Sequence, residues 1–233
     1  MTGDLPTLLD VLAGVVSTTW APDAATSYRV GALARLRAAM PARPSAVTPQ
    51  DVVTIARAEA PAGSVATVDA GAHMLVAVPL WEVAHPGELL VSSGLATMGF
   101  SLPAAIAAAL TLPRQRVICF TGDGGLGMAL AELETLGRLA LDVVVVVFND
   151  ATLSLIAVKQ DDEGHGGDGA TRYSPIDFAT VATGCGVRAE RANDPSSYRS
   201  ALRAALDRTG PSLLDVAVDP SGYPAVLAAI RGG

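Results

Sequence analysis

Hydrophobic residues along this chain fall into short continuous runs and longer helical repeats. The runs VICFT (117–121) and VVVVVF (143–148) are rich in β-branched residues, which predicts two strands of a parallel sheet, buried on both faces. Between them, residues 126–140 repeat apolar side chains at helical spacing. The segment therefore predicts a strand, a glycine turn, a helix and a second strand. The same patterns predict further helices at 5–16, 28–40, 195–209 and 223–231, and a strand at 212–218.

This alternation predicts an α/β fold, a doubly wound parallel sheet flanked by helices. With 233 residues, half of them hydrophobic, the chain can form one domain or slightly more. Residues 41–49 predict a linker, after which Thr48 and Pro49 predict the N-cap and first position of a helix. Residues 162–173 are rich in glycine and predict a mobile loop, either a solvated surface loop, which is the commoner case, or one that closes over an active site.

The composition argues against several functions. The net charge is −7, and the chain has no basic stretch that would indicate binding to nucleic acid or to an anionic membrane. Cys119 lies in a predicted buried strand and Cys185 in a glycine turn, so they do not suggest a disulfide framework, and we expect a cytoplasmic protein. No signal peptide is visible, and the apolar stretches are too short to cross a membrane.

Two aspartates follow the two predicted central strands. Asp123 stands in the turn Gly122-Asp123-Gly124, and Asp150 ends the next strand. Because open α/β sheets bind ligands at the carboxyl ends of their strands, both side chains should lie at that edge. Magnesium usually takes one or two carboxylates together with substrate phosphates. Since Asp123 alone would repel a phosphate, the pattern predicts a magnesium ion that bridges the aspartates and a diphosphate.

The same glycines allow a second interpretation. GDGGLG (122–127) satisfies the G-x-G-x-x-G dinucleotide fingerprint, and Asp150 could bind the ribose of NAD. A nicotinamide oxidoreductase therefore remains an alternative. The aspartate inside the turn, and the position of the turn deep in the chain, count against it.

Several motifs together resemble the thiamine diphosphate (ThDP) enzymes. Residues 122–150 are similar to the ThDP signature, in which G-D-G is followed after about two dozen residues by N-N or N-D. Residues 92–110 resemble the pyrimidine-holding segment of acetolactate synthase-like enzymes, and residues 68–77 their diphosphate loop. The resemblance continues to residue 227 and covers about residues 46–233. It implies the C-terminal, diphosphate-binding domain of this family.

The resemblance implies a set of binding residues. Asp123 and Asp150 would ligate Mg²⁺ with their side chains and Thr152 with its backbone carbonyl, although many relatives have asparagine where Asp150 stands. His73 would reach the diphosphate. Backbone groups of the glycine turn would also contact it, from Gly122, Gly124, Gly125 and Leu126.

Other positions would contact the rest of the cofactor or the substrate. By resemblance, Met98 wedges beneath ThDP and holds it in a V, while the backbone of Ala96, Thr97 and Met98 binds the pyrimidine. Most relatives have glycine at position 96. Lys159 stands where branched-chain acetolactate synthases carry tryptophan and could pair with a substrate carboxylate or phosphate. An exposed lysine with no role is equally compatible with the sequence.

The resemblance also implies missing parts. Residues 1–45 resemble the tail of a central domain and its linker, and nothing matches the pyrimidine-binding domain with its cofactor-activating glutamate. We expect that domain on another or longer chain, in a homodimer or homotetramer. The implied activity is decarboxylation of a 2-oxo acid, with or without carboligation to a second carbonyl. An inactive ThDP-binding or regulatory subunit is the alternative that the missing glutamate permits.

Overall fold

The computed structural model of the protein describes residues 4–15, 21, 23–40, 43, 46–164 and 169–231. Its contacts divide the chain into two units, Met1–Ala34 and Arg35–Gly233. The predicted helices 5–16 and 28–40 are present as α1 (Leu5–Val15), which buries no side chain, and α2 (Ala24–Ala39). The described part of the predicted linker, Arg43 and residues 46–48, leads into α3 (Pro49–Glu59). Thr48 caps α3 as predicted, because its hydroxyl accepts a hydrogen bond from the Asp51 backbone.

Within the described residues, six parallel strands form one sheet in the order β2-β1-β3-β4-β6-β5. This confirms the predicted α/β fold. The strands are β1 (Val65–Val68), β2 (Leu89–Val91), β3 (Val117–Gly122), β4 (Val143–Asn149), β5 (Arg188–Ala192) and β6 (Ser212–Ala217). The chain moves outward from β1 to β2 and then returns to place β3 on the other side of β1. The strand order therefore reverses between β1 and β3, where open sheets form a ligand crevice.

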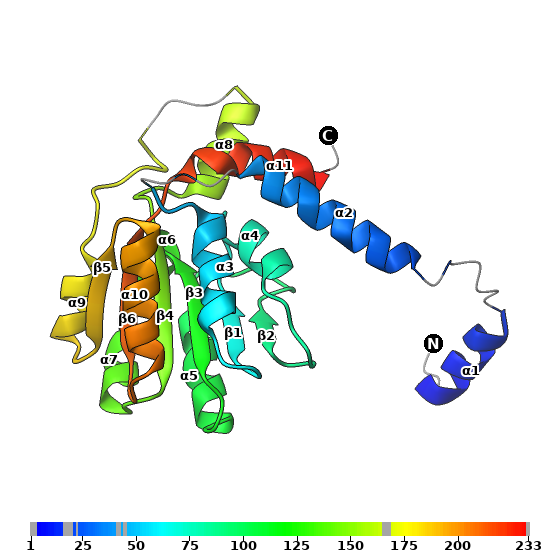
Figure 1. Ribbon diagram of the computed structural model, residues 1–233, viewed down its shortest axis with the longest axis horizontal. Helices are drawn as coiled ribbons and strands as arrows, with labels where there is room; N and C mark the ends of the chain where they lie inside the picture. The colour runs from blue at the N-terminus through cyan, green and yellow to red at the C-terminus, as the bar shows by residue number, and fades with distance from the viewer. Residues whose placement is uncertain are drawn as a thin grey trace. The chain divides into compact units, whose positions relative to one another are not determined.

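Helices pack on both faces of the sheet. A buried cluster on one face joins side chains of α5 (Ser101–Thr111), α7 (Glu132–Arg138) and α9 (Phe178–Gly184) to strand residues such as Val145. The other face is covered by α3, α4 (Met74–Leu80) and α10 (Pro195–Leu206), and Figure 1 shows α3 and α10 in front of the strands. Trp81, at the end of α4, packs edge-on against Phe120 of β3. Both central strands are buried on both faces, as their apolar runs predicted.

The predicted continuous helix at 126–140 is wrong. The chain forms α6 (Asp123–Met128) and α7, separated by Ala129, Leu130 and Ala131. Around this break several amides bond to the carbonyl three residues back, as in Ala129 to Leu126 and Glu132 to Ala129. This tighter winding changes the path of the backbone but keeps apolar residues facing the core, so the hydrophobic repeat does not reveal it. The other predicted elements are present, with α10 ending at Leu206 and with α11 (Tyr223–Arg231) as predicted.

The predicted glycine-rich loop is held firmly at its C-terminal end. The Leu153 amide donates to the Thr171 carbonyl at 2.8 Å, and the Tyr173 amide donates to the Ala151 carbonyl at 3.2 Å. Residues 165–168 lie outside the described part of the chain. Because of these two hydrogen bonds, residues 171–173 lie beside the turn that carries Asp150.

Candidate ThDP and magnesium site

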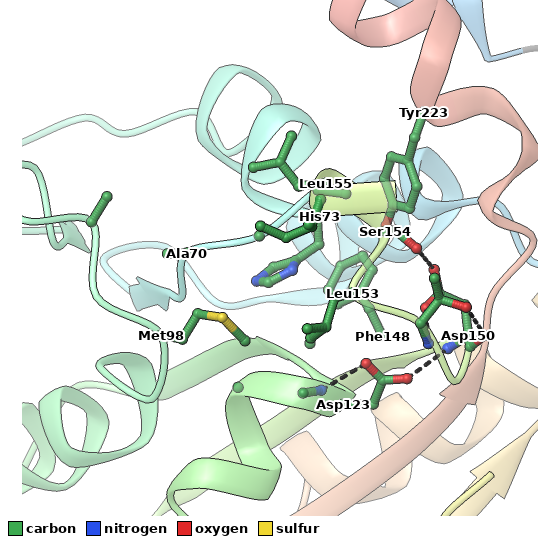
Figure 2. A pocket seen from close by; sticks show the side chains of 18 residues that line it. Ala70, His73, Met98, Asp123, Phe148, Asp150, Leu153, Ser154, Leu155 and Tyr223 are labelled. Atoms are coloured by element: carbon green, nitrogen blue, oxygen red, sulfur yellow. Dashed lines mark hydrogen bonds between the residues drawn. The ribbon is translucent and has the colours of Figure 1, made fainter. Parts of the chain in front are cut away.

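A cavity of about 190 Å³ lies at the carboxyl ends of β1, β3 and β4, beside the reversal in strand order. In Figure 2, Asp123 and Asp150 lie on one side of this cavity, with His73 and Met98 on the other. The walls also include α8 (Ser154–Asp162) and the first residue of α11. The lining residues are Ala70 to His73, Ala96, Met98, Gly122 to Gly125, Phe148, Asp150, Thr152 to Ile156 and Tyr223.

Asp123 is only 3% exposed, and hydrogen bonds surround its carboxylate. Oδ1 accepts from the Gly124 amide at 2.7 Å and the Tyr173 hydroxyl at 2.6 Å. Oδ2 accepts from the amides of Asp150 at 3.1 Å and Ala151 at 2.6 Å. Burial raises the pKa of Asp123, although these four donors oppose the shift. Asp123 thus ties the end of β3 to the turn after β4.

Asp150 faces the same cavity with fewer partners. Its Oδ1 accepts from the Thr152 amide at 3.1 Å, and its Oδ2 accepts from the Ser154 hydroxyl at 2.5 Å. Burial, together with the nearby Asp123 charge, raises the pKa of Asp150 to about 6. The partly desolvated carboxylates of Asp123 and Asp150 repel each other, and a bound cation would relieve that repulsion. The described residues contain no cluster of three or more His, Cys, Asp or Glu side chains suited to a metal, so further ligands would have to be backbone or phosphate oxygens.

His73 is buried and stacks on Phe148, with ring centroids 5.2 Å apart. It stands at the N-cap position of α4, but its side chain caps no backbone amide. Its Nε2 is buried without a hydrogen-bond partner. Burial lowers the pKa of His73 to about 4, so the ring is neutral at pH 7. A buried nitrogen without a partner beside a cavity is costly unless a ligand satisfies it.

Two predicted cofactor contacts also line the cavity. Met98 is half-buried, and Figure 2 shows its side chain directed into the cavity. Ala96 has a φ of 50°, in the left-handed region that favours glycine. Ala151, in the turn between Asp150 and Thr152, has a φ of 54°. Strained backbone of this kind tends to cluster at functional sites.

Three predicted positions do not line the cavity with their side chains. Thr97 is exposed, and its amide donates to the Ser92 hydroxyl at 3.3 Å. Leu126 is fully buried in the core, so only its backbone can face a ligand. Lys159 is exposed on α8, about one turn beyond Leu155 and Ile156, which line the cavity instead.

The sequence reasoning missed two residues that organise the site. Asp69, fully buried after β1, accepts hydrogen bonds from the amides of Gly99 and Phe100, both at 3.0 Å, and so holds the segment that carries Met98. An acidic residue directly after an apolar strand was the available signal. Tyr173 bonds to Asp123 from 50 residues away, and no local pattern announces it. Burial and the Asp123 carboxylate raise the pKa of Tyr173, so its phenol is a neutral donor.

Comparisons with known proteins identify the family of this chain. Residues 69–216 match the family described as "Thiamine pyrophosphate enzyme, C-terminal TPP binding domain". The chain is 35% identical over 166 residues to the acetolactate synthase isozyme 1 large subunit of Escherichia coli K12, covering 70% of this chain and 30% of that protein. It is 31% identical over 190 residues to a probable acetolactate synthase large subunit of Methanococcus aeolicus, covering 78% and 31%. The chain thus spans about a third of these relatives' length.

A solved structure has the same fold. The thiamine diphosphate-dependent 4-hydroxybenzoylformate decarboxylase of Rhodococcus jostii RHA1 superposes with a TM-score of 0.72 at 23% identity, covering 77% of this chain and 34% of that one. In the described part of our chain, no helix has the length and apolar character needed to cross a membrane, and Cys119 and Cys185 are free thiols. The family match and the cavity that holds Asp123, Asp150 and His73 lead to one conclusion: this chain belongs to the thiamine pyrophosphate enzymes and carries their C-terminal TPP-binding domain.

Proposed function

We propose that this chain is the diphosphate-binding domain or subunit of a ThDP-dependent 2-oxo acid decarboxylase or carboligase of the acetolactate synthase type. The observation that carries the proposal is the meeting of Asp123, Asp150 and His73 around one cavity at the reversal of the sheet. The identities of 31 to 35% with acetolactate synthase subunits support the type of enzyme.

The residues present fit a magnesium ion and a diphosphate. Asp123 and Asp150 would ligate the cation with their carboxylates and Thr152 with its backbone carbonyl, leaving phosphate oxygens to complete an oxygen shell. His73 Nε2, buried and without a partner, would be satisfied by a phosphate oxygen. Gly124 has no side chain that would block a diphosphate from approaching the backbone of this turn. A Cβ at this position would also stand only 2.5 Å from Leu153 Cδ2.

The remaining cofactor contacts concern the two rings of ThDP. Met98 would press on the cofactor from the cavity wall and hold it in a bent form, which brings its reacting groups together. The backbone of Ala96, Thr97 and Met98 would hold the pyrimidine edge, and the φ of 50° at Ala96 fits a site where relatives have glycine. When bound, ThDP supplies a carbon centre that stores the electron pair left by decarboxylation of the substrate. The protein's part is to bind, orient and exclude water.

Activity would need a second domain. The chain spans about 30% of its acetolactate synthase relatives. By the resemblance of its sequence, it lacks a match to the pyrimidine domain and its activating glutamate. We propose that residues 1–45 belong to a central domain and its linker, residues 46–233 form the ThDP domain, and another or longer chain supplies the pyrimidine domain in a homodimer or homotetramer. If no such chain exists, the protein would be an inactive ThDP-binding or regulatory subunit.

Calorimetry with the full chain and its partner tests the proposal. ThDP should bind in the presence of Mg²⁺ and much more weakly with a chelator, whereas NAD should not bind. Asp123→Ala should abolish the Mg²⁺-dependent binding. Asp142→Ala should retain it, because Asp142 directly precedes β4 at the amino ends of the strands, away from the cavity. Equal ThDP binding by the parent and Asp123→Ala would exclude the proposed site.

A further inference from the structure

The phenol of Tyr173 contacts the carboxylate that we propose as a metal ligand. Together with the Gly124 amide it fills Oδ1 of Asp123, while the amides of Asp150 and Ala151 fill Oδ2. A carboxylate offers about four lone-pair positions to hydrogen-bond donors. All four are therefore occupied on Asp123. A cation can reach this carboxylate only if one donor leaves.

The four donors differ in how easily they can leave. The Gly124 amide belongs to α6, and the amides of Asp150 and Ala151 belong to a turn whose backbone is set by the φ of 54° at Ala151. Moving any of them would shift a strand end or a helix start. The Tyr173 hydroxyl sits on a half-buried side chain, and the Tyr173 backbone is held separately by its bond to the Ala151 carbonyl. The phenol can therefore rotate away while the chain stays in place.

We propose that the Tyr173 hydroxyl takes the place of the cation on Asp123 and is displaced when the cation binds, so that Tyr173 sets the cation affinity of the site. This inference rests on the proposed function. Without a cation, the hydroxyl satisfies a buried carboxylate that would otherwise be costly. Asp150 needs no such exchange, because each of its oxygens accepts a single bond from its own turn or from α8. Tyr173 is thus a positioning residue that competes with the metal.

Tyr173→Phe in the full chain tests the exchange, with Mn²⁺ as the probe and ThDP either present or absent. Electron paramagnetic resonance of free Mn²⁺ should show about tenfold tighter binding by the variant, the effect expected from removing one competing charge-assisted hydrogen bond. Without cation the variant should unfold at a lower temperature than the parent. With saturating Mn²⁺ and ThDP this difference should disappear, because the parent has then lost the same bond.

Tyr198→Phe is the matched control. Tyr198 is also buried and donates to the Val52 carbonyl at 3.1 Å, away from the cavity. It should lower the unfolding temperature equally with and without cation, and leave Mn²⁺ affinity unchanged. Asp123→Asn, which should not bind Mn²⁺, checks that the parent binds the ion at the proposed site. If it does, Mn²⁺ binding by Tyr173→Phe that is equal to or weaker than that of the parent would overturn this inference but not the proposed function. A parent that binds no Mn²⁺ would overturn the proposed function and this inference together.

Discussion

Gly125 lies so close to Asp69 that a Cβ at position 125 would stand 2.1 Å from Asp69 Oδ2. No real side chain is accommodated at such a distance, and Asp69 cannot retreat without releasing Gly99 and Phe100. We therefore expect Gly125→Ala to lower the free energy of unfolding by about 2 kcal/mol, as overpacked cores do. Urea denaturation measures this change.

Gly127 is the control within the same helix, because a Cβ there meets nothing within 4 Å. Gly127→Ala should raise stability by up to about 1 kcal/mol, since alanine favours a helix over glycine. The close approach to Asp69 would be refuted if the two alanine variants were equally stable.

Asp150→Asn should keep ThDP and Mg²⁺ bound, because by the resemblance many relatives carry asparagine at this position. Its pH dependence should change. The pKa of Asp150 is raised to about 6, so protonation of this carboxyl should weaken Mg²⁺ binding by the parent as pH falls from 7 to 5. The asparagine variant should lose less affinity over that range, as measured by calorimetry at both pH values. A steeper loss in Asp150→Asn than in the parent would contradict the ligand role.

His73 should make stability depend on pH. Its folded-state pKa is about 4 against 6.5 in the unfolded chain, so the unfolded chain takes up the proton first and stability is lost as pH falls from 6.5 to 4. The raised pKa of Asp150 acts in the opposite sense, so the parent must be compared with His73→Gln. Between pH 7 and 5.5 the parent should lose about 1 kcal/mol more than the variant in urea titrations. Parallel pH profiles would show that His73 is not buried as a neutral ring.

The rim beside the cavity should mediate self-association. Leu95 is 87% exposed and Met128 66% exposed, and a Cβ on Gly99 would lie 3.5 Å from Met128. Exposed apolar side chains beside a cofactor site that needs a second domain favour contact with another copy of the chain. Light scattering should show a dimer or larger species for the parent and less of it for Leu95→Ser. Leu110→Ser, on the last turn of α5 and 56% exposed, should behave like the parent. A parent protein that remains monomeric in light scattering would contradict the prediction that this surface mediates self-association.

Lys159 provides a test of substrate choice in the assembled enzyme. It is exposed one turn beyond Ile156. By the resemblance, it stands where branched-chain acetolactate synthases carry tryptophan. We expect the parent not to favour 2-oxobutanoate over pyruvate as acceptor, and Lys159→Trp to shift the product ratio toward 2-oxobutanoate. Competition between the two acceptors measures it. A strong parental preference for 2-oxobutanoate, unaffected by the substitution, would refute the idea.

The sequence alone predicted the features that depend on local patterns. The runs at 117–121 and 143–148 predicted buried strands because parallel strands covered on both faces carry apolar residues at every position. The order of chain elements then placed Asp123 and Asp150 at one edge, since parallel strands all end on the same side. The thiamine diphosphate family likewise followed from motifs that stand in a fixed order along the chain.

Only the tertiary structure decided features that join distant segments. The bonds from Tyr173 to Asp123, and from the Gly99 and Phe100 amides to Asp69, bridge 50, 30 and 31 positions and leave no periodic trace. The sequence did not predict the break between α6 and α7, because a few hydrogen bonds from an amide to the carbonyl three residues back preserve the apolar repeat. Lys159 lies on the same side of α8 as Leu155 and Ile156 but one turn farther along, where it is exposed and does not line the cavity. Such contacts depend on how packed elements meet in space, which hydrophobic spacing along one element does not encode.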